Sequence, residues 1–317
     1  NPRFAESVNG FKDYTSNLLK LLKKANRATS QLFTNYNYKF GGKNFIRDFI
    51  CAEFVASIKE GPAYTLRLAG NWAINNPFTI ANLMRKYQNG KLDLSKENDR
   101  LFKEFIENGG QTGYVFIEDL EKQKRKIDAA VERLSKVGNT NTNPVVKATL
   151  LLNVIQYVNE CIELVARFST YVTSRNTKDK SGTPRSILKS IDDAKRITTN
   201  FNRKGAQSGM GLIGGTAALM GTINFFYNAQ VQGVQTFKRL NDEHPVKTKV
   251  GIGMWAGLGY SMPFIVSLFI GDDEDDQLYY NIPEYERKNN ICIPFGKSKV
   301  TMTIPLSPTL RELYAIG

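Results

Sequence analysis

The sequence is dominated by two long stretches that contain no charged residue. The first covers 33 residues between Lys204 and Lys238, and the second covers 22 residues from Val250 to Gly271. A helix without charged side chains has no face that favours water, so it is expected to pack against neighbouring protein or lipid. A short polar segment with Pro245 separates the two stretches. We therefore predict an apolar helical hairpin over 205–271.

The second uncharged stretch has the length of a membrane span. As a helix it would extend about 33 Å at ~1.5 Å per residue, and the hydrocarbon core of a bilayer is roughly 30 Å thick. Gly253 and Gly257 have the four-residue spacing that lets two helices approach closely, and Gly214 and Gly221 are the corresponding candidates in the first stretch. Burial inside a large assembly explains the same glycines, so both environments stay open.

The rest of the chain predicts an all-α fold, an extended assembly of long amphipathic helices. A basic helical region covers 1–176, the polar segment 177–184 links it to the remainder, and 185–317 forms a second region. Gly41-Gly42 is expected to interrupt the helices, and alternating residues over 291–305 predict a small β-hairpin near the C-terminus. Helices are expected in the following segments: 4–33, 45–58, 64–72, 78–87, 97–107, 117–137 and 146–172.

Positive charge is concentrated in the first two thirds of the chain. Residues 1–204 hold 34 Lys and Arg against 20 Asp and Glu, a net charge of +14, whereas residues 205–317 hold 9 against 10, a net charge of −1. This asymmetry favours an acidic partner for 1–204, either DNA or an anionic membrane. A solvated surface explains it equally well, since no basic cluster alternates with aromatic residues as a stacking groove would require.

The residues that enzymes use are sparse or badly placed. His244 is the only histidine, and the three cysteines lie far apart without the spacing of a disulfide framework or a zinc site. Asp192 and Asp193 are adjacent on an expected helix and should point apart. The five acids of 272–276 lack the alternation of a calcium loop and are read as a solvated turn. We expect no enzyme, no cofactor and no metal site.

Several short motifs resemble a known family. They are Arg196–Gly205 (RITTNFNRKG) followed by Phe225–Gly233 (FFYNAQVQG), Pro283–Asn290 (PEYERKNN), and Ile304-Pro305-Leu306 leading to Tyr314–Gly317. Together they resemble a large polyvalent protein-associated domain, which occurs in giant multi-domain proteins of bacteriophages and conjugative elements. The resemblance covers roughly residues 185–317, and Gly109–Gly113 fits it more loosely. The family offers no catalytic residues to carry over.

The resemblance implies a helical, non-catalytic structural protein that is carried inside the virion, in the capsid or tail lumen, and enters the host envelope or cytoplasm during DNA ejection. Its partners would be other virion proteins such as portal, tail or further cargo copies, with DNA and the host membrane as further candidates. Asn200, Asn202, Arg203 and Lys204 are expected to form a turn held by side-chain amides, or else phosphate contacts. Two alternatives stay open: a membrane-inserting channel segment of an ejection apparatus, and a DNA-binding module of a larger enzyme-bearing protein.

Overall fold

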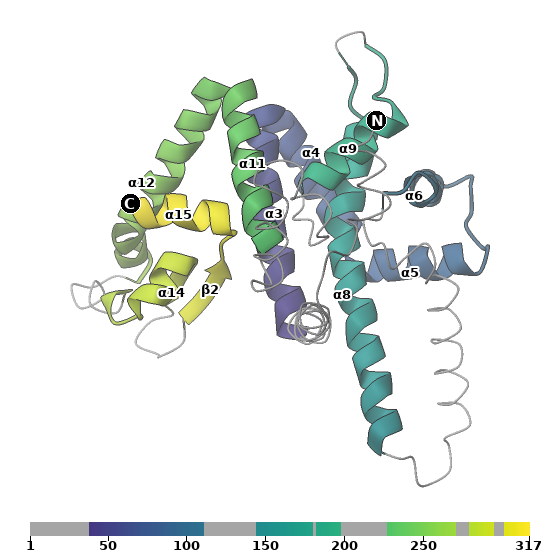
Figure 1. Ribbon diagram of the computed structural model, residues 1–317, viewed down its shortest axis with the longest axis horizontal. Helices are drawn as coiled ribbons and strands as arrows, with labels where there is room; N and C mark the ends of the chain where they lie inside the picture. Colours follow the sequence, from purple (N-terminus) through teal and green to yellow (C-terminus); the bar gives the residue numbers. More distant parts are fainter. Residues whose placement is uncertain (1–37, 111–143, 180–181, 198–226, 271–278, 295–300) are drawn as a thin grey trace, which may run out of the picture.

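The computed structural model describes residues 38–110, 144–179, 182–197, 227–270, 279–294 and 301–317 (Figure 1). Over these ranges the chain forms ten helices and one two-stranded antiparallel hairpin, so the predicted all-α fold is confirmed. The helices are α3 (Tyr38–Lys59), α4 (Pro62–Ile74), α5 (Pro77–Gln88), α6 (Glu97–Glu107), α8 (Pro144–Arg175), α9 (Ile187–Ile197), α11 (Tyr227–Glu243), α12 (Pro245–Ile270), α14 (Glu284–Asn289) and α15 (Pro308–Ile316).

Local signals in the sequence explain several of the helix ends. Asn76 caps α5, because its side-chain oxygen accepts hydrogen bonds from two backbone N–H groups of the first turn, and Pro77 follows at the first helical position. Gly90 and Gly109 have positive φ angles of 63° and 73° just beyond α5 and α6. Glycine adopts this left-handed conformation without steric cost, so both helices end where the sequence predicts.

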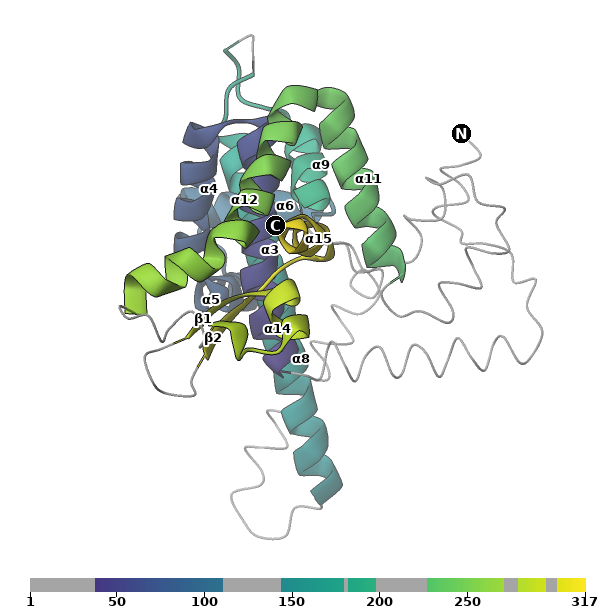
Figure 2. The same ribbon diagram turned by 90° about the vertical axis from the view of Figure 1, so that its left-hand side faces the viewer.

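The first of two hydrophobic cores surrounds the C-terminal half of α8. Phe168, Tyr171 and Val165 are completely buried there, among aromatic side chains that include Phe102 and Phe105 of α6. Helices α3, α4, α5, α6 and α9 pack around this half, while the N-terminal half extends away from the other described helices (Figures 1 and 2). The prediction of a central, enclosed helix therefore applies to the C-terminal half of α8.

The second core lies on the other side of α3, and α3 separates the two. Ala52 and Ala56 face the first core, whereas Phe54 and Ile58 face the second. The second core also contains apolar side chains of α11, α12, α15 and the hairpin, among them Leu240, Met262, Val266, Cys292, Leu306, Leu310 and Tyr314. Because α3 is buried on two faces, its apolar residues do not form a single stripe.

The expected break at Gly41-Gly42 is wrong, since α3 begins at Tyr38 and runs through both glycines. Gly41 is buried against Asn159 and Ile162 of α8, and a Cβ atom there would collide with the Asn159 side chain. The glycine therefore serves a close approach of two helices. Tertiary packing has overridden its poor intrinsic preference for a helix interior.

The predicted β-hairpin over 291–305 is confirmed. Strand β1 (Asn290–Pro294) pairs antiparallel with β2 (Thr301–Pro305), and Cys292 lies opposite Thr303. Cys292 on β1 is fully buried in the second core while Met302 and Thr303 on β2 are exposed, so β1 is the strand that packs against this core. The backbone N–H of Leu306 then bonds to the carbonyl of Asn289, which closes the hairpin before α15 begins.

The segment 177–184, predicted to link two regions, connects two helices that pack directly on each other. Lys178 and Pro184 form an isolated β-bridge, and the backbone N–H of Arg185 donates to the carbonyl of Thr177. Helix α9, which follows this loop, contributes Ile191 and Ala194 to the first core. The helices on both sides of this loop thus belong to the first core.

Several sequence predictions fall outside the described residues. These are the helices expected over 4–33 and 117–137, the part of the apolar hairpin over 205–226, and the acidic segment 272–276. From Tyr227 onward the hairpin prediction can be compared with the structure, where α11 and α12 follow one another and pack together (Figure 1).

Candidate functional site

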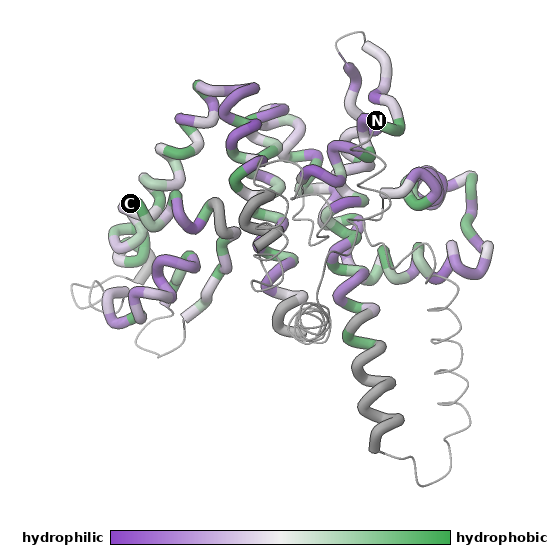
Figure 3. The backbone as a smooth tube through the Cα atoms, in the orientation of Figure 1, coloured by the Kyte–Doolittle hydropathy of each residue, from purple (hydrophilic) through white to green (hydrophobic). Residues whose placement is uncertain are grey.

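Helix α12 forms from the second uncharged stretch, with the first turns supplied by the preceding polar residues. It has 26 residues, contains Pro263 in its interior, and bends along its length (Figure 2). Proline removes one backbone hydrogen bond and crowds the preceding turn, which accounts for the bend. Most of α12 beyond its start lacks strongly hydrophilic residues (Figure 3).

One side of α12 is packed against the second core. Met262 and Val266 are buried in the second core, together with Leu310 and Tyr314 of α15, and the Trp255 ring contacts the Phe54 ring of α3 edge-on, with 6.3 Å between the centroids. Near its start, the buried hydroxyl of Thr248 donates to the Leu240 carbonyl at 2.9 Å and fixes α12 to α11. These contacts make α12 an integral part of the fold.

The opposite side of α12 is exposed and apolar. Within the described part of the chain α12 is the one helix long and apolar enough to cross a bilayer, yet only 11% of its most apolar window is buried. The large apolar side chains exposed along it are Val246, Val250, Met254, Tyr260, Phe264 and Leu268. With Gly257 between Met254 and Tyr260 they recur every three or four residues, so they occupy one continuous side. We call these six residues, with Gly253 and Gly257, the outer face of α12.

The glycines of α12 divide between its two sides. Gly251 lies against Phe54 and Ile58, and Gly259 lies against the backbone of Tyr314, so a Cβ atom at either position would meet another helix. At Gly253 and Gly257, the pair predicted for helix packing, a Cβ atom would have no atom of the described residues within 4 Å. The predicted pair is therefore on the open side, while the glycines used inside the molecule are the two that the spacing did not single out.

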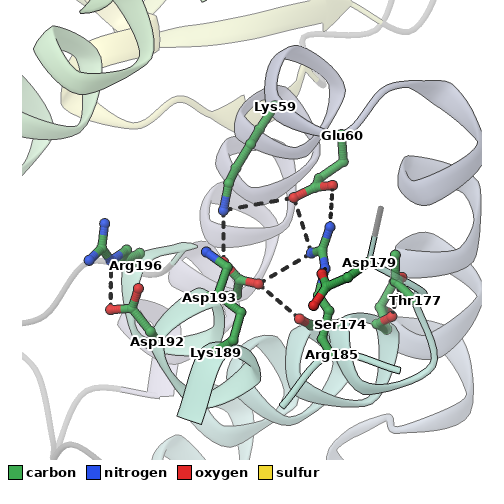
Figure 4. A network of polar contacts seen from close by, with 11 residues as sticks. Lys59, Glu60, Ser174, Thr177, Asp179, Arg185, Lys189, Asp192, Asp193 and Arg196 are labelled. Atoms are coloured by element: carbon green, nitrogen blue, oxygen red, sulfur yellow. Dashed lines mark hydrogen bonds and ion pairs between the residues drawn. The ribbon is translucent and has the colours of Figure 1, made fainter. Parts of the chain in front are cut away.

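A separate cluster of charged side chains joins α3, α8 and α9 (Figure 4). Arg185 is its centre: its guanidinium donates to both carboxylate oxygens of Glu60, at 3.1 and 2.7 Å, and lies 3.3 Å from Asp193. Asp193 also accepts hydrogen bonds from Lys59 at 2.7 Å and from Ser174 at 2.8 Å. The cluster ties three helices together near the end of α3.

The adjacent acids Asp192 and Asp193 point apart, as predicted. Asp192 pairs with Arg196 one turn along the same helix, whereas Asp193 turns inward to the cluster. Burial opposes ionisation of Asp193, but the hydrogen bond and positive charge of Lys59 outweigh it and lower the pKa of its carboxyl. A carboxylate with a lowered pKa and three donors is a stable ion-pair partner and a poor general base.

A cavity of about 70 Å³ lies beside this cluster, between α3, α9 and α11. Its walls include Lys59, Glu60, Asp193, Arg196 and Arg239, and the two acids are already engaged by Arg185 and Lys59. This volume is well below the roughly 300–1,000 Å³ of pockets that bind small molecules, so the cavity is too small for most organic substrates. We read the cluster and its cavity as structural.

The three cysteines lie in surroundings that oppose ionisation of their thiols. Burial raises the thiol pKa of Cys51 and Cys292 to about 11 and that of Cys161 to about 12, so all three are unreactive thiols near neutral pH. Among the residues that the structure describes, no group of three or more His, Cys, Asp or Glu side chains gathers where it could hold a metal.

The other predicted site residues cannot be placed. Asn200, Asn202, Arg203 and Lys204 lie outside the described residues, as do Gly214 and Gly221. Sequence reasoning missed the role of Arg185, which follows a proline in a polar segment and carries no signal of burial. The nearest sequence signal is the run of alternating charges around it, and that pattern is also typical of solvated loops.

Comparison with known proteins gave no match. No protein-family model, no curated protein and no solved structure is similar to this chain.

Proposed function

We propose that this chain is a non-catalytic structural part of a large phage-type protein that travels in the virion and is ejected into the host with the DNA. Two findings support the proposal: the resemblance of the motifs in 185–317 to polyvalent protein-associated domains, and the outer face of α12. The second carries more weight, because soluble monomers rarely expose a long continuous apolar surface unless it binds something.

The distribution of polar groups also favours a structural role. The buried charges around Arg185 are paired internally and the cavity beside them is small, and the buried Arg167 and Asp48 are likewise paired, with Glu163 and Arg47. The large apolar side chains of the outer face, in contrast, are exposed on a helix anchored by two glycine contacts to α3 and α15. An exposed face on a firmly held helix is suited to assembly with a neighbour rather than to a reaction.

Mass spectrometry of purified, nuclease-treated phage particles tests the proposal. We expect peptides of this chain in the particle at a defined copy number relative to the major capsid protein, and their loss from particles that have ejected their DNA. The chain's absence from intact particles would refute it. Retention in emptied particles would place it in the shell and contradict delivery.

DNA contact through the basic region 1–204 stays a second prediction. Several of its described basic side chains are engaged in ion pairs, including Lys86 with Asp99 and Arg175 with Glu104. Binding of the full chain to duplex DNA should weaken steeply between 50 and 200 mM salt, as counterion release requires for phosphate contacts. A response that is flat in salt would dismiss it.

A further inference from the structure

We infer that the outer face of α12 is a membrane-surface site: it lies in the interface of a lipid bilayer with its apolar side chains among the acyl chains. The opposite side of α12 stays packed on the protein. This inference deepens the proposed function by naming lipid as the partner of that face. It differs from a transmembrane span, which the sequence alone also allowed.

The packing of α12 favours a peripheral position. A spanning helix would have to leave the second core, where Met262 and Val266 are buried to within 2% of complete and Gly259 lies against Tyr314. Withdrawing these residues would expose Leu310 and Tyr314 of α15 as well. A helix lying in the interface requires none of this, because it uses only the side that is already exposed.

The length and bend of the outer face favour lipid over a second copy of the chain. From Val246 to Leu268 the face extends about 33 Å at ~1.5 Å per residue. Two helices that cross at a Gly-xxx-Gly pair diverge on either side of the crossing point. Contact centred on Gly253 and Gly257 would therefore leave Phe264 and Leu268, beyond Pro263, in water. Acyl chains are fluid and cover a bent surface along its whole length.

The residues at the edges of the outer face are of the kinds found at the headgroup level of a lipid bilayer. Lys247 and Lys249 are exposed in the first turns of α12, immediately before the uncharged stretch, where their ammonium groups can reach lipid phosphates. Tyr260, exposed to 69%, presents an amphipathic ring that suits the headgroup level.

Binding through the outer face can be distinguished from the non-specific electrostatic attraction of a basic protein to an anionic membrane. The whole chain has a net charge of +13, which by itself draws it to anionic vesicles at low salt. The outer face has no charged residue, and the five acids of 272–276 follow it in sequence. Binding through this face should therefore occur on neutral lipid and persist when salt screens the charges.

Flotation of the full chain with phosphatidylcholine vesicles in 0.5 M NaCl tests the inference. We expect the wild type to float, and the double variant Met254→Asp/Phe264→Asp to lose about tenfold or more of its partition, because two exposed apolar side chains no longer enter the acyl region. Leu188→Asp is the matched control: Leu188 is 77% exposed on α9, and its substitution should leave flotation unchanged. Circular dichroism and thermal melting establish that each variant is folded.

Gly253→Leu distinguishes lipid from a second copy. Because nothing lies within 4 Å of a Cβ at Gly253, the variant adds apolar surface without disturbing the fold, and lipid binding should stay equal or increase. Close helix–helix contact would instead be blocked, so a dimer seen by sedimentation and abolished by Gly253→Leu would overturn the inference in favour of self-association. If the double variant fails to fold, flotation and sedimentation of Gly253→Leu still test the inference.

Two further outcomes would overturn the inference. One is a wild-type protein that stays with the soluble fraction on neutral vesicles at high salt, and the other is flotation that Met254→Asp/Phe264→Asp leaves intact. Neither outcome affects the presence of the chain in particles, so the failure of the lipid site and the failure of the proposed function are separate results.

Discussion

Replacing Arg185 by methionine should destabilise the protein far more than any surface charge removal. Arg185 is 9% exposed and makes two hydrogen bonds to Glu60, one to Asp193 and an ion pair with Asp179. Removing one partner of a buried pair costs about 3–5 kcal/mol, because the other charge stays buried without compensation. Asp193 keeps Lys59 and Ser174, whereas Glu60 keeps only a longer contact with Lys59 at 3.8 Å, so the loss falls mainly on Glu60 and we expect about 3 kcal/mol, the lower end of that range.

Urea unfolding followed by circular dichroism at 222 nm measures this loss, with Arg196→Ala as the control. Arg196 forms an ion pair with Asp192 one turn away, but both side chains are more than 40% exposed, so its removal should cost about 0.5 kcal/mol or less. The double variant Arg185→Met/Glu60→Gln should recover part of the loss, since no uncompensated carboxylate remains. An Arg185→Met variant as stable as Arg196→Ala would refute the view that this cluster holds α3, α8 and α9 together.

Three other predictions follow from single contacts. Burial raises the carboxyl pKa of Glu53 to about 7 and that of Asp48 to about 6, so the folded state binds protons that the unfolded chain has lost. Stability should therefore fall as the pH rises from 4.5 through 7, and Glu53→Gln should reduce that decline in pH-dependent melting, leaving the share of Asp48. Gly259→Ala should destabilise by about 1–3 kcal/mol because its Cβ meets the Tyr314 backbone, whereas Gly257→Ala should stabilise by up to about 1 kcal/mol in the same melting assay. Asn76→Ala removes the cap of α5 and should cost about 1 kcal/mol in chemical unfolding, and an unchanged midpoint would contradict the role of the cap.

Local signals predicted the ends of α4, α5 and α6 and the start of α8 to within two residues, because the physics of those ends is local. Asn76-Pro77 opens α5, Pro144 opens α8, and α6 has the predicted bounds Glu97–Glu107. A cap or a left-handed glycine acts within a few residues, so the sequence contains the whole cause. Gly41 is the exception, since its reason for lying inside α3 is a neighbour on α8 more than a hundred residues away.

The candidate site was predicted only in outline. The sequence predicted a long uncharged helix over 250–271, and the structure contains α12 over Pro245–Ile270. A packing role for Gly253 and Gly257 stays a prediction, because both glycines lie on the exposed side of that helix. It did not show that Gly251 and Gly259 make the internal contacts, because every glycine in an uncharged helix has the same local character. The central role of Arg185 was also invisible, since its partners Glu60 and Asp193 are brought to it by the packing of α3 and α9.

The sequence by itself determined that this chain is helical, where many of its helices begin and end, and that a 22-residue apolar helix lies near its C-terminal third. Only the tertiary structure decided which side of that helix is buried. In an amphipathic helix the polar residues indicate which side is exposed, but α12 has no charged residue on any side from Val250 onward. Its two sides differ only in what α3, α11 and α15 cover, and that follows from the packing of the whole chain.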